Sequence, residues 1–236
     1  IAIASQPTIS TTSMPGGEVG VAYSSGVSAS GGNGSLTYTI SNGTLQTGAI
    51  YLARDPGGAQ GTLTVDTGGI VQANNEFIDL GLGAGSTGTV NANAGSISAK
   101  GIFVGGISTE ARGTGVLNIA GGAVTASVLA GLTNSGQVRV WDTPGSAINL
   151  SAGSLTCDSL NTSGNPTRFN WTGGTLAITG AGVFLDNSAA TLVQNTIQNN
   201  GNSTTLDGGG VYVVTGTATL ITNTLAGNQA QRGGGV

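Results

Sequence analysis

Apolar and polar residues alternate along three short stretches that lie 27 residues apart: Thr62–Val65, Thr89–Ala92 and Val116–Ile119. Alternation with a period of two is typical of a β-strand that buries one face. A glycine-containing turn follows each stretch, and further apolar positions come after that turn. Self-similarity at a fixed interval of this length is the signature of a solenoid. Because the repeated unit is strand-like, the sequence predicts an all-β fold, a parallel β-helix.

The repeat also predicts which residues lie above one another, since side chains one period apart meet directly in a stack of coils. Two sets are expected to form core columns: Leu63, Val90 and Leu117, and Ile70, Ile97 and Val124. A third strand of each coil is expected at Ile78–Gly81, Ile102–Gly105 and Val128–Gly131. Asn91 and Asn118 should stack on the outer surface above Thr64. Three strands per coil then form three parallel sheets around a narrow core, with glycine at the corners.

The coils are expected to extend over residues 47–236, as one right-handed parallel β-helix of seven or eight coils. The interval loosens after the third repeat, and Trp141 and Trp171 are predicted at the same position of successive coils. Two interpretations of the tryptophans remain open: a stacked pair at a wide corner, or a platform on which a sugar ring stacks. The chain starts without Met and ends inside a glycine pattern, so we expect a piece of a longer protein.

Residues 1–46 differ from the rest, with short alternating strands between glycine-rich turns. The segment from Gly17 to Gly43 resembles the Ig-like modules of large bacterial surface proteins. It is too short for a complete sandwich. The sequence therefore predicts either a partial Ig-like module or a β-rich cap over the first coil.

Two further resemblances cover the coils. Residues 48–182 resemble the glycine-rich β-strand repeats of autotransporter passengers, through the pattern Gly-Thr-Leu-Thr-Val followed by Gly-Gly. The final segment resembles the repeats of chlamydial polymorphic outer-membrane proteins and of pectate-lyase-like β-helices, because Gly208–Val211 recurs as Gly233–Val236. There, Thr191 realigns with Thr219, and Asn195 and Asn223 would form a structural ladder at a bend. These resemblances imply a secreted or cell-surface bacterial protein with a β-helix fold.

Composition narrows the possible partners. Charged residues make up 7% of the chain, against about 25% in an ordinary globular protein, and the net charge is −4. No basic stripe is present that could neutralise phosphates, so nucleic-acid binding is not expected. No apolar run approaches the roughly 18 residues of a transmembrane segment. Cys157 is the only cysteine; it is expected to be a buried core residue, with a reactive or intermolecular thiol as the alternative.

Candidate catalytic groups are few. The chain has no histidine, the commonest general base, and only ten acidic residues. We therefore predict no catalytic residues, although many β-helices of this kind degrade polysaccharides. One acidic group is a weak candidate for Ca²⁺ binding, with solvated turn residues as the alternative interpretation: Asp55, Asp66, Glu76 and Asp79. No other cofactor is expected.

The sequence thus favours a non-catalytic, extracellular or cell-surface structural segment of a fibre, stalk or adhesin. One alternative is a self-assembling filament subunit, whose N-terminal strands cover the last coil of the next subunit. The other is a β-helix that binds or degrades carbohydrate. The expected partners are further copies of the chain, or a surface glycan or receptor.

Overall fold

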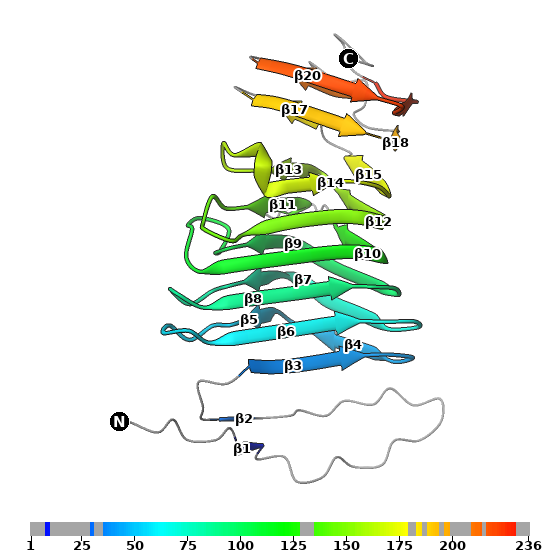
Figure 1. Ribbon diagram of the computed structural model, residues 1–236. Helices are drawn as coiled ribbons and strands as arrows, with labels where there is room; N and C mark the ends of the chain where they lie inside the picture. The colour runs from blue at the N-terminus through cyan, green and yellow to red at the C-terminus, as the bar shows by residue number, and fades with distance from the viewer. Residues whose placement is uncertain are drawn as a thin grey trace.

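The computed structural model describes residues 8–9, 29–30, 35–127, 135–178, 183–185, 188–193, 196–198, 209–213 and 216–229. These residues are all-β apart from one short 3-10 helix, η1 (Pro166–Arg168). Their strands stack as successive coils of a parallel β-solenoid (Figure 1). The predicted all-β parallel β-helix is confirmed.

Three strand positions recur from coil to coil, and each defines one face of the solenoid. Face 1 is formed by β3 (Ser35–Ile40), β6 (Gln60–Val65), β8 (Thr87–Ala92), the first parts of β10 (Thr114–Ala126) and β12 (Ala147–Cys157), and β14 (Phe169–Trp171). Face 2 is formed by β4 (Thr44–Thr47), the first parts of β7 (Ile70–Leu80) and β9 (Ser96–Val104), the second parts of β10 and β12, β15 (Thr175–Ile178), β18 (Thr196–Gln198) and β21 (Thr224–Ala226). Face 3 is formed by β5 (Ile50–Leu52), the second parts of β7 and β9, β11 (Gln137–Val140) and β13 (Ser159–Asn161).

The remaining strands form three separate pairs. Near the C-terminus, β16 (Val183–Leu185) runs parallel to β19 (Val211–Val213), and β17 (Ser188–Val193) runs parallel to β20 (Gly216–Ile221). Near the N-terminus, β1 (Thr8–Ile9) pairs antiparallel with β2 (Ala29–Ser30). On the near side of Figure 1 the face-1 strands run from left to right, and the chain returns behind them while it climbs from β3 towards β20. This is the right-handed sense that parallel crossovers normally adopt.

The core consists of columns of apolar side chains, two behind each face, and the first column of each face shows the pattern. Strands one coil apart lie at the ordinary spacing of about 4.8 Å, so each core residue packs directly on the next. The face-1 column contains Leu63, Val90, Leu117 and Ile148. The face-2 column contains Val71, Ile97, Val124, Leu155, Leu176 and Ile197. The face-3 column contains Ile78, Ile102 and Val138. All are buried, and complete burial of one such side chain contributes about 1.5–3 kcal/mol.

The register confirms the first predicted column and corrects the second. Leu63 pairs with Val90, and Val90 with Leu117, as the 27-residue interval predicts. Ile70, however, pairs with Ser96, and it is Val71 that pairs with Ile97. The turn from Asp66 to Gly69 is one residue longer than the turn at Asn93–Gly95, so the interval shortens to 26 after it. Val71 is accordingly 0% exposed, whereas Ile70 points outwards and is 38% exposed.

The third strand of the third repeat also differs from the prediction. Ile78 pairs with Ile102 as expected, but Ile102 then pairs with Val138 of β11. The expected strand at 128–131 lies outside the described residues, and its place beside β9 is taken by residues 138–140. Ten residues, 127–136, therefore separate β10 from β11. The simple interval failed here because it assumed a constant number of residues between strands.

The parallel ladder begins earlier than residue 47. β3 already pairs in register with β6, and β4 with β7. The predicted boundary at 46/47 thus falls inside a coil, because Ser35–Thr47 has the same strand–turn–strand pattern as the later coils. Apart from β1 and β2, residues 1–34 lie outside the described part of the chain, and the predictions of an Ig-like module or a cap fall on them. At the other end, the predicted 28-residue realignment is confirmed, since Thr191 pairs with Thr219 and Ile197 with Leu225.

Candidate functional site

The four acidic residues predicted as weak calcium ligands do not form one cluster. Asp55 is exposed in the loop between β5 and β6, whereas Glu76 and Asp79 belong to β7. Asp66 lies at the corner between faces 1 and 2, where its Oδ1 accepts a hydrogen bond of 3.0 Å from Nδ2 of Asn93. Among the described residues, no three histidines, cysteines or acidic residues lie close enough together to hold a metal ion.

Asp79 is a buried carboxyl group on the outer side of face 3. It is 5% exposed, and its Oδ1 has no hydrogen-bond partner. In register it lies between Tyr51 and Phe103, so its neighbours along the face are aromatic. Burial raises the pKa of Asp79 to about 7, against the opposing effect of the positive charge of Arg112. Desolvation penalises the charged form of a carboxyl group, which accounts for the direction of the shift.

Trp141 packs under a short hairpin at the edge of face 3. The hairpin runs from Gly105 to Arg112, and its turn includes the hydrogen bond from the Ile107 amide to the Glu110 carbonyl, 3.0 Å. Trp141 Nε1 donates to the carbonyl of Ile107 at 2.8 Å. The guanidinium of Arg139 lies 4.7 Å from the centre of the Trp141 ring, and burial lowers the pKa of Arg139. Arg139 therefore already occupies a face of the ring on which a sugar would stack.

The side chain of Trp171 is on the inner side of its strand. It pairs with Leu150 at the end of face 1 and is 7% exposed. The two tryptophans were predicted at one position of the repeat, but Trp141 follows a face-3 strand and Trp171 ends a face-1 strand. That prediction is wrong because Val138–Trp141 and Phe169–Trp171 share an apolar–polar–apolar pattern without sharing a face. The two rings therefore do not form a common platform.

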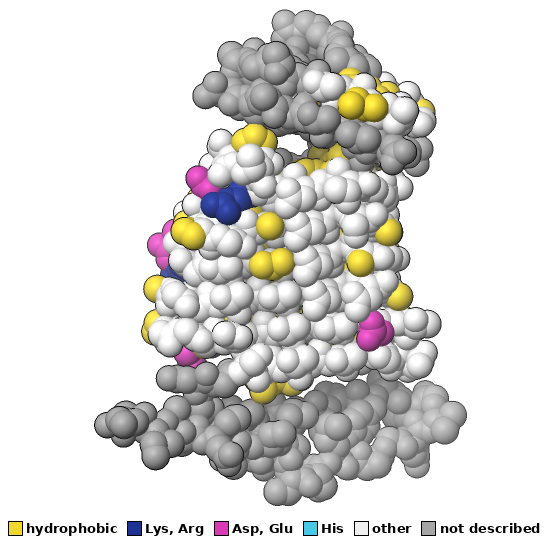
Figure 2. Space-filling view, viewed as in Figure 1, with side chains coloured by type: hydrophobic (Ala, Val, Ile, Leu, Met, Phe, Trp, Pro, Cys, Tyr) yellow, Lys and Arg dark blue, Asp and Glu magenta, His cyan; other side chains and the backbone are white. Residues whose placement is uncertain are grey.

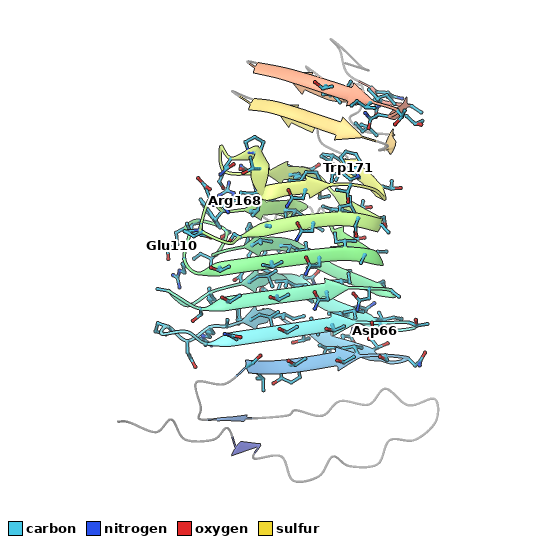
Figure 3. The ribbon with its side chains drawn as sticks, in the orientation of Figure 1. Asp66, Glu110, Arg168 and Trp171 are labelled. Carbon is cyan, nitrogen blue, oxygen red and sulfur yellow. The ribbon has the colours of Figure 1, made fainter. Side chains whose placement is uncertain are left out.

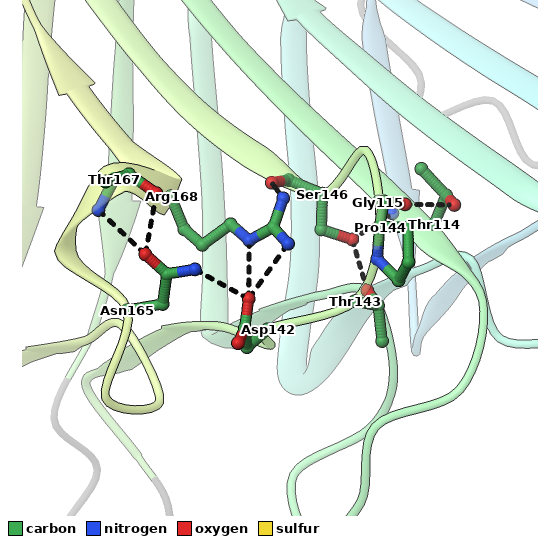
Figure 4. Close-up of polar contacts among 9 residues, drawn as sticks. All are labelled: Thr114, Gly115, Asp142, Thr143, Pro144, Ser146, Asn165, Thr167 and Arg168. Carbon is green, nitrogen blue, oxygen red and sulfur yellow. Dashed lines mark hydrogen bonds and ion pairs between the residues drawn. The ribbon is translucent and has the colours of Figure 1, made fainter.

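A charged cluster ties together the corner loops of two successive coils (Figure 4). Arg168, at the end of η1, donates to Asp142 from Nε at 2.9 Å and forms an ion pair with it at 2.8 Å. Asn165 Nδ2 donates to the same carboxyl oxygen at 2.8 Å. These hydrogen bonds, that of Asn165 first, hold the pKa of Asp142 below its usual range. Figure 3 places Arg168 and Glu110 along one edge of the solenoid and Asp66 at the opposite edge of face 1.

A ladder of asparagine side chains runs up the outer side of face 1. Asn118 Nδ2 donates to Asn91 Oδ1, and Asn149 Nδ2 donates to Asn118 Oδ1, both at 2.8 Å. Asn170 continues the ladder by donating to Asn149 at 2.8 Å, and Asn91 reaches Thr64 at 3.4 Å. The sequence predicted that Asn91 and Asn118 stack above Thr64. Asn149 and Asn170 were missed, although each lies between two apolar residues as Asn91 and Asn118 do.

The asparagine pair predicted near the C-terminus cannot be compared in the same way. Asn195 lies outside the described residues, and Asn223 follows β20 at a half-buried position. Cys157, by contrast, is clearly placed: it lies on the inner side of face 2, in register with Ile178, and is buried. It is therefore a core residue, as predicted, and this burial raises the pKa of its thiol to about 12.

Faces 1 and 2 have uncharged outer surfaces. None of the described strands or strand parts that form them contains Lys, Arg, Asp or Glu. Their outward positions hold Thr, Ser, Asn, Gln and Ala, together with the aliphatic residues Ile70 and Val116. Figure 2 shows face 1 as a broad surface without charge across its centre, with charged side chains at its edges. The described charges are instead found on face 3 and at the corners.

No protein family, curated protein or solved structure matches this chain. Within its described part, no helix is both long enough and apolar enough to cross a membrane.

Proposed function

We propose that this chain is a non-catalytic structural segment of a secreted or cell-surface bacterial fibre, stalk or adhesin. The observation that supports this most directly is the continuous stack of parallel strands over an aliphatic core. Each coil is hydrogen-bonded to the next along its faces, so the unit resists bending. Such a rod can hold a binding or anchoring region at a distance from a surface.

The distribution of polar groups also favours a structural role over catalysis. The hydrogen-bonded asparagines and the Asp142–Arg168 pair connect successive coils rather than surround a common space. The chain has no histidine. A glycosidase needs two carboxyl groups within roughly 5–9.5 Å of each other across a substrate. Asp79 has a pKa of about 7, but its carboxyl group is buried between Tyr51 and Phe103. It is therefore poorly placed to act as one of such a pair.

The test is the location of the protein on intact producing cells. Antibodies to the chain, detected with gold particles in the electron microscope, should label the exterior of intact cells. External protease should remove that label. Label that appears only after the cells are broken would contradict a surface role. In parallel, turnover by the purified chain of acidic or neutral polysaccharides would contradict the non-catalytic assignment.

A self-assembling filament subunit is the second candidate, favoured by β3, the first strand of the described parallel ladder. Tyr38 is in register with the buried Leu63 but is 40% exposed, and Leu36 is 38% exposed. Core positions exposed at a coil end are able to accept another strand layer. Electron microscopy of the purified chain at micromolar concentration tests this. Filaments that disappear when residues 1–34 are deleted, with the β-type circular dichroism retained, would support head-to-tail assembly through that segment; isolated particles of the intact chain would contradict it.

A further inference from the structure

The outward side chains of face 1 form a regular two-dimensional array, here called the face-1 array. It has four rows in register, contributed by β3, β6, β8 and β10. Its members alternate with the core residues and carry hydroxyl, amide or methyl groups. They are Ser35, Thr37, Thr39, Gln60, Thr62, Thr64, Thr87, Thr89, Asn91, Thr114, Val116 and Asn118.

The array is held rigidly. Its strands pair in register along their whole length, and core side chains pack behind them. The bonds from Asn118 to Asn91 and from Asn91 to Thr64 fix the orientation of one column of side chains. Figure 1 shows the face-1 strands nearly parallel from β3 to β12, without the fanning that a strongly twisted sheet would have. A rigid planar array loses little conformational entropy when it meets a rigid planar partner.

The chemistry of the array restricts the partner. It contains no charged side chain, so it does not hold the tightly bound hydration shells of ions. It contains no aromatic side chain among its twelve members, so it offers no ring on which a sugar could stack. What remains is a surface of hydroxyl, amide and methyl groups that can form hydrogen bonds with an uncharged lattice.

The spacing of the array is close to that of water in ice. Two O–H···O bonds of roughly 2.75 Å that meet at the tetrahedral angle separate second-neighbour oxygens by about 4.5 Å. Rows of the array repeat at about 4.8 Å. Alternate residues along a strand are about 6.7 Å apart, and the stacking repeat of the same tetrahedral lattice is about 7.3 Å. The row mismatch of about 0.3 Å accumulates to about 0.9 Å over four rows, and the mismatch of about 0.6 Å along a strand accumulates to about 1.2 Å over three positions. Side-chain rotation has to absorb both differences.

We propose that the face-1 array binds the surface of ice crystals. Hydroxyl and amide groups of the array take the places of lattice waters, and the methyl groups of threonine and valine lie in the hollows between them. Each contact is weak, but many of them form at once on a rigid surface, which makes the attachment strong overall. This goes beyond the proposed structural role, and it would hold whether the rod belongs to a fibre, a stalk or an adhesin.

The test compares two variants of the full chain that differ only in the face they alter. Thr62→Arg with Thr89→Arg places two stacked arginines on face 1. Ser98→Arg with Thr125→Arg does the same on face 2 and serves as the matched control. The fraction of protein incorporated into slowly growing ice and the thermal hysteresis of the solution are measured for each. Circular dichroism and thermal melting confirm that both variants fold.

The expected result is that the wild-type chain is incorporated into ice and depresses its growth. The face-1 variant should lose about tenfold or more of this activity, and the face-2 control should stay within about twofold of wild type. Should the face-1 pair fail to fold, Thr89→Lys replaces it, with Thr125→Lys as its control. Exclusion of the wild-type chain from ice, or equal losses in both variants, would overturn the proposal. Retention on crystalline cellulose or chitin but not on ice would identify a polysaccharide lattice as the partner instead. None of these outcomes affects the cell-surface role, which the labelling experiment tests separately.

Discussion

The register of the second core column gives a sharp prediction, because two adjacent residues exchange the roles that the repeat suggests. Val71 is 0% exposed and lies between Leu45 and Ile97 in the stack. Ile70 is 38% exposed and lies between Thr44 and Ser96 on the outer surface. Substitution of each by threonine should therefore have very different consequences.

Val71→Thr keeps the shape of the side chain but places a hydroxyl group in an aliphatic core. Burial of a hydroxyl without a partner costs about 1–3 kcal/mol on mutational scales. Ile70→Thr replaces a partly exposed ethyl group with a hydroxyl that matches the polar neighbours in its column, so we expect a cost below about 1 kcal/mol. The free energy of unfolding is measured by urea titration with far-ultraviolet circular dichroism. Its dependence on urea concentration should be the same for both variants.

A result in the opposite order would refute the observed register. A larger loss for Ile70→Thr would mean that Ile70 faces the core, as the constant 27-residue interval predicts. Equal and small losses would mean that neither residue is packed in a dry column. Leu117→Ala, at a core position on which the sequence and the structure agree, provides the internal standard and should cost about 2–5 kcal/mol.

Three other predictions concern polar and titratable groups. Asn118→Ala removes the hydrogen bonds to Asn91 and Asn149, and should lower the free energy of unfolding by about 1–3 kcal/mol in the same urea assay; an unchanged midpoint would show that the ladder adds no stability. The pKa of Asp79 in the folded chain is about 7, above its ordinary value of 3.8, so the folded state binds this proton more tightly. The contribution of Asp79 to stability should then fall as the pH rises from about 4 to about 7, and Asp79→Asn should remove that part of the pH dependence; a wild-type profile that the variant leaves unchanged would contradict the burial of the carboxyl group. Since burial raises the pKa of Cys157 to about 12, a thiol reagent at neutral pH should label it only after unfolding, and rapid labelling of the folded chain would contradict its place in the core.

The face-1 column was predictable from the sequence because the successive coils have the same total length. Leu63, Val90 and Leu117 stay 27 residues apart because the extra residues in the first of these coils, at Asp66–Gly69 and within β7, are offset by a shorter segment between β7 and β8 than between β9 and β10. Alternation within each strand then assigns the inner and outer sides without further information. For the same reason the outward positions of Thr64, Asn91 and Asn118 could be predicted.

Prediction failed where a corner changes length, because apolar strands of similar composition are then interchangeable. Residues 128–130 are apolar throughout, and residues 138–140 alternate between apolar and polar, so both sequences suit a strand. Only the pairing with β9 shows that residues 138–140 form face 3. One additional residue before Ile70 had the same effect on a smaller scale, since a shift of one position moves a side chain to the other face of the strand.

The outer features of face 3 were not predictable from the sequence. The contact between Arg139 and Trp141 could be suspected from their spacing, but the hairpin at Gly105–Arg112 that packs on them could not. Its residues belong to the preceding coil, and no repeat marks them. The burial of Asp79 depends on the same kind of long-range packing, which an isolated acidic residue in a sequence does not reveal.

Diffraction from an oriented sample of the purified full chain tests the central claim, a stiff rod of stacked parallel strands, most directly. Because the strands lie across the axis of the solenoid, we predict a strong reflection at about 4.8 Å along the rod axis. The electron microscope should show straight, unbranched particles in the same preparation. Compact particles without an axial reflection, or a reflection perpendicular to the long axis, would contradict the account.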